Sequence, residues 1–230
     1  MELQSLPIAY SALLLDSDGV LVDSQELTDR ALRVWAAEIE VDADLVLKMV
    51  VGRRMADVAP SLVAAGRIEG ALAEFRRIEL SLAREARPCP GALELVRTLH
   101  GSNAKWAIVT SAERAVAWAR LAAAGLRRPP VIVAADDVQR GKPEPDGYVL
   151  AANLLGVAPG SCLAVDDRPI GVAAARAAGA AAIRIDSTSA SSSKQSVIRS
   201  LDEIDISVQD EKIIVMSRVY ATSGGRHDED

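Results

Sequence analysis

The sequence has few aromatic residues and few cysteines. Aromatic residues make up 3% of its 230 residues, so Leu, Val, Ile and Ala have to fill the interior. The two cysteines, Cys89 and Cys162, lie far apart without the spacing of metal ligands, and one bridge between them would not make a disulfide framework. We therefore interpret both as buried thiols.

The chain also lacks an excess of positive charge and any long apolar run. Its net charge is -6, which argues against nucleic acid or anionic lipid as a main partner. No apolar stretch approaches the ~18 residues that span a bilayer, and residues 1–4 do not begin a secretory signal. We expect a cytoplasmic protein, a monomer or weak homodimer, that acts on a small molecule and binds neither nucleic acid nor membrane.

Short runs of Leu, Ile, Val and Ala predict buried strands. These runs are residues 12–15, 106–109, 131–134, 162–165 and 181–185. Because they are apolar throughout rather than alternating, they are typical of a parallel sheet covered on both faces. Helical patterns that stop at Gly125, Gly156 and Gly179 separate the last four runs. The sequence therefore predicts an α/β fold with a Rossmann-like, five-stranded parallel core sheet.

The region between the first two predicted strands contains only helical patterns. It covers residues 24–87, which is too long for an ordinary crossover connection. We expect an inserted helical cap there, followed by a turn-rich hinge at residues 87–91. The predicted division is a core of residues 1–23 and 88–230 and a cap of residues 24–87.

Three further segments follow the last predicted strand. Residues 186–193 form a polar, low-complexity sequence and predict a loop. Two apolar runs, 206–208 and 213–216, flank Asp210 and Glu211 and predict a hairpin. Residues 223–230 predict a frayed tail.

Acidic residues follow two of the predicted strands at their carboxyl ends, where parallel α/β sheets place their ligand sites. Asp16 and Asp18 follow the first strand, and Asp166 and Asp167 close the fourth. Four acids at one edge repel one another unless some of them bind a cation, and oxygen ligands favour a hard ion such as Mg2+. A calcium EF-hand is excluded, because Gly19 is fourth in its loop rather than sixth and a strand precedes it.

Phosphate-binding groups follow the other strands. Thr110 and Ser111 lie where a strand gives way to a helix, so hydroxyls and free N–H groups can meet an anion beside the positive helix end. Lys142, in the loop after the third strand, adds a positive charge. Taken singly, Thr110 is a capping hydroxyl and Lys142 a surface lysine. Together with the carboxylates they indicate phosphoryl transfer to a carboxylate nucleophile.

Four motifs carry a resemblance to a known family. They are LDSDGVLVDS at 15–24, AIVTS at 107–111, GKPEP at 141–145 and VDDRPIG at 165–171. In their order and spacing, from residue 13 to 185, the chain resembles phosphatases of the haloacid dehalogenase (HAD) superfamily. Its helical insertion and the string 106–111 are similar to the sugar and polyol phosphatases related to β-phosphoglucomutase.

The resemblance implies a mechanism. Asp16 would attack phosphorus, and Asp18 would protonate the leaving alcohol and later take a proton from the hydrolytic water. Thr110, Ser111 and Lys142 would hold the phosphoryl group. The implied function is a Mg2+-dependent phosphatase that hydrolyses a small sugar or polyol phosphate through an aspartyl-phosphate.

The resemblance also implies the metal ligands and a substrate contact. Mg2+ would be held by Asp16, by the main-chain carbonyl of Asp18, and by Asp166 and Asp167. Arg53 matches the region where related caps present a basic residue. A contact with a sugar hydroxyl or a second anion, and a solvated arginine at a helix start, both stay open for it.

Two residues depart from the family pattern. Ser17 stands where members usually carry a hydrophobic residue, and Arg168 begins a turn whose residues are usually small, where it would pair with an acid or crowd the site. These two residues keep open a catalytically silent phosphate-binding or interaction protein. A phosphomutase like β-phosphoglucomutase also stays open, because the same motifs would serve it.

Overall fold

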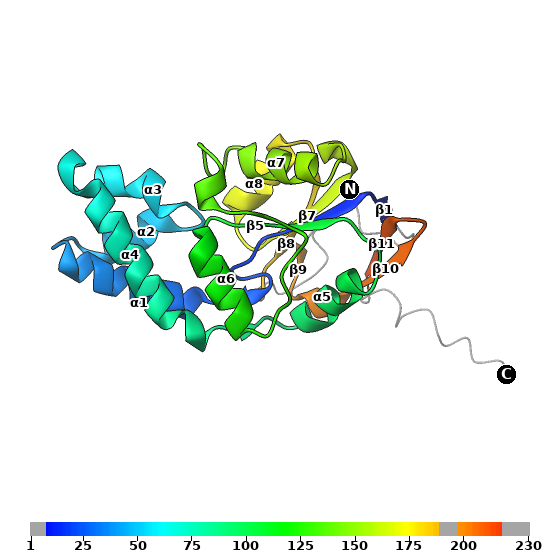
Figure 1. Cartoon of the computed structure of the whole chain (residues 1–230), viewed down its shortest axis with the longest axis horizontal. Helices are drawn as coiled ribbons and strands as arrows, with labels where there is room; N and C mark the ends of the chain where they lie inside the picture. The colour runs from blue at the N-terminus through cyan, green and yellow to red at the C-terminus, as the bar shows by residue number, and fades with distance from the viewer. Residues whose placement is uncertain (1–7, 189–196, 218–230) are drawn as a thin grey trace.

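A parallel sheet lies at the centre of the molecule (Figure 1). The structure is a computed structural model that describes residues 8–188 and 197–217. The six strands of the sheet follow the order β6-β5-β2-β7-β8-β9, and all neighbours run parallel. Their bounds are β2 (Ala12–Leu15), β5 (Trp106–Val109), β6 (Val131–Val133), β7 (Cys162–Asp166), β8 (Ala181–Ile185) and β9 (Val197–Ile198). The predicted α/β class and Rossmann-like sheet are confirmed, with β9 as a sixth strand beyond the five predicted.

Helices cover both faces of this sheet, which explains why its strands are apolar throughout. Leu13 and Leu15 pack into one hydrophobic cluster with α5 and α6, whereas Leu14 packs into a second with α7 and α8. The four helices are α5 (Ala92–His100), α6 (Arg114–Ala123), α7 (Asp146–Leu154) and α8 (Pro169–Ala177). The glycines after α6, α7 and α8 all have positive φ, as their predicted positions require.

The helical insertion begins after β3 (Val22–Asp23) and ends at β4 (Arg87–Pro88), and these two strands pair antiparallel. Its helices are α1 (Gln25–Glu38), α2 (Ala43–Val50), α3 (Met55–Val58) and α4 (Ile68–Leu82). They pack around a hydrophobic cluster of their own, in which the indole of buried Trp35 donates to the carbonyl of Ala71 at 2.7 Å. This separate cluster supports the predicted domain boundaries, which stay a prediction.

A second, antiparallel sheet lies at the end of the molecule opposite the insertion (Figure 1). The predicted hairpin is present as β10 (Ile204–Gln209) and β11 (Lys212–Ser217). A strand that the sequence did not predict, β1 (Ile8–Tyr10), pairs with β11. The predicted tail, and the part of the predicted polar loop after residue 188, lie outside the described residues.

Short 3-10 helices complete the described chain; they are Ala59–Ser61, Ala65–Arg67, Ala83–Glu85, Ala135–Asp137, Pro159–Ser161 and Leu201–Glu203. Cys162 is buried as predicted, whereas Cys89 is only half-buried, and both are free thiols. Within residues 8–188 and 197–217, no helix has the length and apolar character needed to cross a membrane.

Candidate active site

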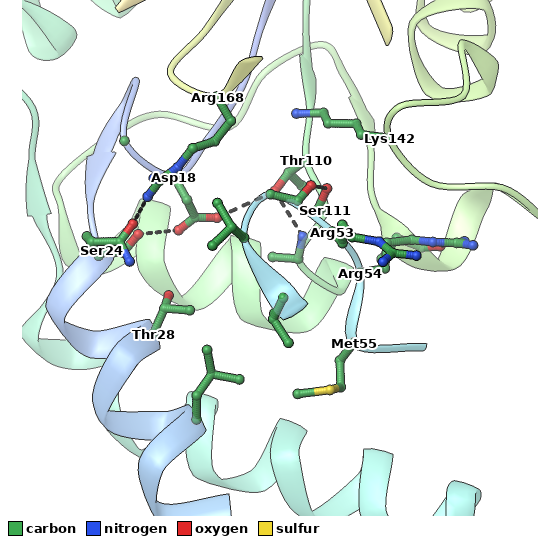
Figure 2. A pocket seen from close by; sticks show the side chains of 18 of the residues that line it. Asp18, Ser24, Thr28, Arg53, Arg54, Met55, Thr110, Ser111, Lys142 and Arg168 are labelled. Carbon is green, nitrogen blue, oxygen red and sulfur yellow. Dashed lines mark hydrogen bonds between the residues drawn. The ribbon is translucent and has the colours of Figure 1, made fainter. Parts of the chain in front are cut away.

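A pocket of about 390 Å³ lies between the carboxyl ends of the central strands and the insertion. All the site residues considered from the sequence line it; they are Asp16, Asp18, Arg53, Thr110, Ser111, Lys142, Asp166 and Asp167. Figure 2 shows the insertion residues Thr28 and Met55 on the far wall from Lys142. The pocket therefore brings together groups from remote parts of the chain.

The register of the sheet places two of the acids side by side. Strands β2 and β7 pair in parallel with Leu15 opposite Val165, so Asp16 and Asp166 leave the sheet next to each other. Carboxylate oxygens of Asp16, Asp166 and Asp167 all lie within 4.8 Å of one another. We call these three residues the acid cluster.

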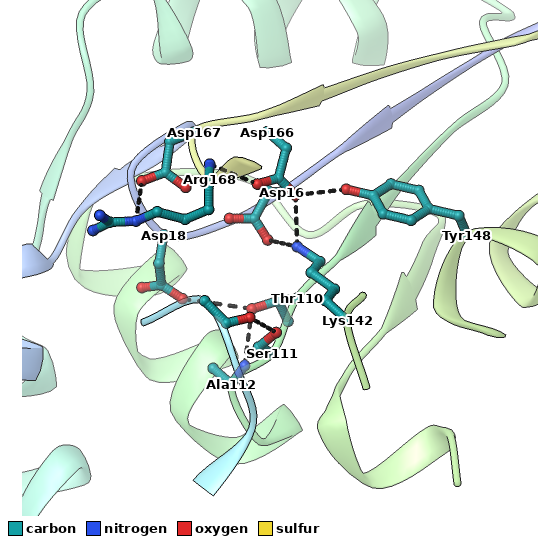
Figure 3. Close-up of polar contacts among 11 residues, drawn as sticks. Asp16, Asp18, Thr110, Ser111, Ala112, Lys142, Tyr148, Asp166, Asp167 and Arg168 are labelled. Atoms are coloured by element: carbon teal, nitrogen blue, oxygen red, sulfur yellow. Dashed lines mark hydrogen bonds and ion pairs between the residues drawn. The ribbon is translucent and has the colours of Figure 1, made fainter. Parts of the chain in front are cut away.

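Lys142 reaches into the acid cluster from the loop after β6 (Figure 3). Its Nζ donates to Asp16 Oδ1 at 2.6 Å and to Asp166 Oδ2 at 2.7 Å. The Tyr148 hydroxyl also donates to Asp166 Oδ2, at 2.7 Å, and the Arg168 main-chain N–H donates to Asp166 Oδ1 at 2.9 Å. Asp166 is thus held from three sides.

Burial and charge shift the pKa values of this group. Burial raises the pKa of Asp16 well above its usual range even though Lys142 lowers it, and the neighbouring carboxylates raise it further. Burial lowers the pKa of Lys142, but Asp16 and Asp166 outweigh this effect and raise it well above its usual range. Three carboxylates face two cations here, Lys142 on Asp16 and Asp166 and Arg168 on Asp167, so the acid cluster is short of positive charge.

This shortage fits a divalent cation. The acid cluster offers only oxygen ligands, which suit a hard ion such as Mg2+. Burial raises the pKa of Asp167 to about 6, although Arg168, whose Nε lies 2.9 Å from Asp167 Oδ2, lowers it. Gly19 (φ 82°) packs against this carboxylate, and a Cβ at that position would lie 2.4 Å from Asp167 Oδ2. Only glycine lets the turn after β2 come so close.

The Asp18 side chain turns toward other partners (Figures 2 and 3). Its Oδ1 accepts hydrogen bonds from the Ser24 hydroxyl and from Arg120 Nη1, the latter at 2.9 Å. Its Oδ2 accepts from the Thr110 hydroxyl at 3.5 Å. The same hydroxyl accepts from the Ala112 N–H at 3.1 Å, so Thr110 both caps the chain before α6 and faces Asp18.

The remaining predicted residues are placed as follows. Ser111 Oγ donates to the Gly52 carbonyl at 3.1 Å, so this side chain binds the insertion. Arg53 is exposed on the pocket wall. Of the two departures from the family pattern, Ser17 is fully buried and its hydroxyl has no partner among the described residues, whereas Arg168 pairs with Asp167.

A buried arginine of the insertion was missed by the sequence reading. Arg54 donates to the carbonyls of Ala135, Val138 and Gln139 at 2.6 to 3.1 Å and pairs with Asp57. These contacts join the insertion to the segment that leads to Lys142. The sequence could not indicate them, because main-chain acceptors leave no pattern.

A buried ion pair between core and insertion was also missed. Arg120 on α6 donates to Glu79 on α4 at 2.9 Å. A sequence signal existed: Arg120 lies on the same helical face as Val116 and Ala117, and Glu79 lies four residues after Phe75. A charged residue at a position where the periodicity predicts an apolar one marks a buried polar contact.

Comparison with known proteins gives the family. A family model described as haloacid dehalogenase-like hydrolase matches residues 10–179. Hexitol phosphatase A of Escherichia coli is 38% identical over 202 residues, which cover 85% of this chain and 94% of that protein. Fructose-1-phosphate phosphatase YqaB of Escherichia coli is 30% identical over 190 residues, which cover 76% of this chain and 96% of that protein.

Solved structures share the fold. A β-phosphoglucomutase from Clostridium difficile superposes with a TM-score of 0.73 at 19% identity, and the match covers 85% of this chain and 93% of that chain. At that identity the likeness concerns the fold alone. The family model and the sequence relatives establish the family as well as the fold. The chain belongs to the haloacid dehalogenase-like hydrolases, and the two relatives described above are phosphatases.

Proposed function

We propose that this protein is a Mg2+-dependent phosphatase that hydrolyses a small sugar or polyol phosphate through an aspartyl-phosphate. The observation that carries the proposal is the contact of Lys142 Nζ with Asp16 Oδ1 at 2.6 Å and Asp166 Oδ2 at 2.7 Å, inside the acid cluster. The proposed nucleophile, phosphate-binding cation and metal ligands thus all line one pocket, which supports the proposal. The names of the relatives, a hexitol phosphatase and a fructose-1-phosphate phosphatase, support the substrate class.

The reaction divides into two steps. A carboxylate oxygen of Asp16 bonds to phosphorus while the bond from phosphorus to the leaving oxygen breaks, and Asp18 gives that oxygen a proton. Asp18 then takes a proton from the water that hydrolyses the aspartyl-phosphate. The Thr110 hydroxyl, the Ser111 main-chain N–H and the Lys142 ammonium hold the phosphoryl oxygens in both steps.

The metal ligands in this proposal are Asp16, Asp166, Asp167 and the main-chain carbonyl of Asp18. When bound, Mg2+ would offset the charge of the nucleophile and the phosphoryl group as they approach. Lys142 shares Asp16 and Asp166 with this site, so with Mg2+ held by those carboxylates its ammonium would be able to turn toward the phosphoryl group.

We also propose that the insertion, residues 24–87, is a cap over a core of residues 1–23 and 88–230. It forms the pocket wall opposite the acid cluster, so its side chains would meet the end of the substrate remote from phosphorus. Arg53, exposed on that wall, is the candidate for contact with a hydroxyl or a second anionic group.

The proposal is tested by screening sugar phosphates and polyol phosphates, with p-nitrophenyl phosphate as a generic probe, for phosphate release with Mg2+ and with EDTA. We expect release that requires Mg2+ and is fastest with one member of the polyol or sugar group. Absence of release from every compound at all Mg2+ concentrations would support the silent phosphate-binding protein instead.

A phosphomutase would use the same acid cluster, and the chain has the fold of a β-phosphoglucomutase, so this alternative also needs a test. Glucose 1-phosphate and glucose 6-phosphate separate the two. A phosphatase releases phosphate from them or leaves them unchanged, whereas isomerisation without phosphate release would establish the mutase.

A further inference from the structure

Arg120 is a buried arginine outside the four motifs, and its guanidinium joins the core to the insertion. Its side chain is 3% exposed. Nη1 donates to Asp18 Oδ1 at 2.9 Å, and Nη2 donates to Glu79 Oε1 at 2.9 Å and to Thr28 Oγ1 at 3.2 Å. Glu79 lies on α4 and Thr28 on α1, so two helices of the insertion hold one end of a group whose other end holds Asp18.

We propose that Arg120 is a positioning residue that fixes the Asp18 carboxylate and makes its position depend on how the insertion is seated. The inference rests on the proposed function, in which Asp18 protonates the leaving oxygen. A guanidinium is planar and presents its N–H groups in a rigid fork, so anchoring one edge on Glu79 and Thr28 sets where the other edge meets Asp18.

The energetics of these contacts do not favour a purely stabilising role. A buried ion pair is often no more stabilising than well-packed apolar residues of the same volume. Burial raises the pKa of Glu79 to about 7 in spite of Arg120, so ionising this carboxylate is unfavourable. The Nε–H of Arg120 is also buried without a partner among the described residues. We therefore assign to these contacts the position of the Asp18 carboxylate rather than a net gain in the free energy of folding.

Through Arg120, the position of the insertion affects the position of the Asp18 carboxylate. Glu79, Thr28 and Arg120 all line the pocket in which Asp18 lies. If the insertion moves away, Arg120 loses both anchors, and the Thr110 hydroxyl is the partner of Asp18 that stays in place on the core. A misplacement of about 1 Å can lower a catalysed rate about a hundredfold, so proton transfer would be efficient only with the insertion seated.

The test compares two substrates that differ in their need for a proton. The alcohol of glycerol 1-phosphate must be protonated as it leaves, whereas p-nitrophenolate leaves without a proton. Release of the alcohol or of nitrophenolate in the first turnover is measured by rapid mixing, because protonation belongs to that step. For Arg120→Met we expect about a hundredfold loss with glycerol 1-phosphate, less than about tenfold loss with p-nitrophenyl phosphate, and little change in KM.

Further variants keep the test decisive. Arg120→Lys retains the charge but not the fork, and we expect it to recover part of the lost rate. Because Arg120→Met leaves Glu79 buried without a partner, the double variant Arg120→Met/Glu79→Gln is measured beside it. The control is Arg30→Met, which breaks an exposed pair of 2.7 Å with Glu85, and we expect no change with either substrate.

Equal losses with the two substrates, or no loss in folded Arg120 variants, would overturn the positioning role. If the unmutated protein releases neither alcohol nor nitrophenolate, the proposed function itself fails. The two failures are therefore distinguishable.

Discussion

Lys142 illustrates how one side chain serves both the fold and the proposed chemistry. It is buried and contacts two carboxylates that would otherwise lie in the interior without a counter-charge. The same ammonium is the group proposed to hold the phosphoryl oxygens. In the proposed function, these two roles would exchange when another cation occupies the acid cluster.

This exchange predicts a metal-dependent effect on stability. Lys142→Met removes the positive charge that Asp16 and Asp166 share, and we expect it to lower the free energy of unfolding by about 3–5 kcal/mol without Mg2+. Mg2+ should stabilise this variant more than the unmutated protein, because it replaces the missing charge. Urea unfolding with and without Mg2+ measures both effects, with exposed Lys105→Met as the control. Equal stabilisation of the two proteins by Mg2+ would contradict the exchange.

At the scale of residues, the sequence could predict the groups that sit at strand ends. Asp16 and Asp166 follow apolar runs, and the geometry of parallel strands brings such positions to one edge. Arg120 and Glu79 could not be paired in the same way. Their contact depends on which faces of α6 and α4 meet, and local periodicity shows only that each position faces inward.

At the scale of elements, the start of α8 packs directly on the acid cluster. A Cβ added to Gly171 would lie 1.9 Å from Asp166 Oδ2. Gly171→Ala must therefore displace this carboxylate, and we expect a loss of about 1–3 kcal/mol of stability together with most of the phosphatase activity. Urea unfolding and phosphate release from p-nitrophenyl phosphate measure the two effects.

Gly70 on α4 is the matched control. An added Cβ there would meet nothing within 4 Å, so Gly70→Ala should leave activity unchanged and raise stability by up to about 1 kcal/mol. If the two alanine variants had the same stability and the same rate of phosphate release, the packing at Gly171 would not hold Asp166 in place.

The pair between α4 and α6 makes stability depend on pH. Burial raises the pKa of Glu79 to about 7 from an ordinary 4.5. As the pH rises from about 4.5 to about 7, the unfolded chain releases this proton while the folded chain retains it, so stability falls. Glu79→Gln has no such proton, so between pH 5 and pH 8 we expect its stability relative to the unmutated protein to improve by about 2 kcal/mol.

Urea unfolding of both proteins across this pH range is the measurement. Glu85→Gln is the control. Arg30 lowers the pKa of exposed Glu85 in the folded protein, so this side chain is ionised above pH 5 in the folded and in the unfolded chain alike. Parallel stability curves for Glu79→Gln and the unmutated protein would rule out the raised pKa.

At the scale of the whole molecule, the sheet, its covering helices and the helical insertion could be predicted, because short apolar runs, helical patterns and glycine stops repeat along the chain. Strands β1 and β9 could not. They have three and two residues, too few for periodicity, and β1 pairs with β11 from the opposite end of the chain. Short strands depend on the partners that the folded molecule brings to them.

The account of the whole molecule depends on Asp16 as the nucleophile, and Asp16→Asn tests this directly. Asparagine keeps the volume and removes a charge that burial disfavours, so the variant should fold, as its circular dichroism spectrum and melting temperature will show. The decisive measurement is Mg2+-dependent phosphate release from p-nitrophenyl phosphate by this variant beside the unmutated protein. We predict release by the unmutated protein and only background from Asp16→Asn, whereas comparable release from both would contradict the account.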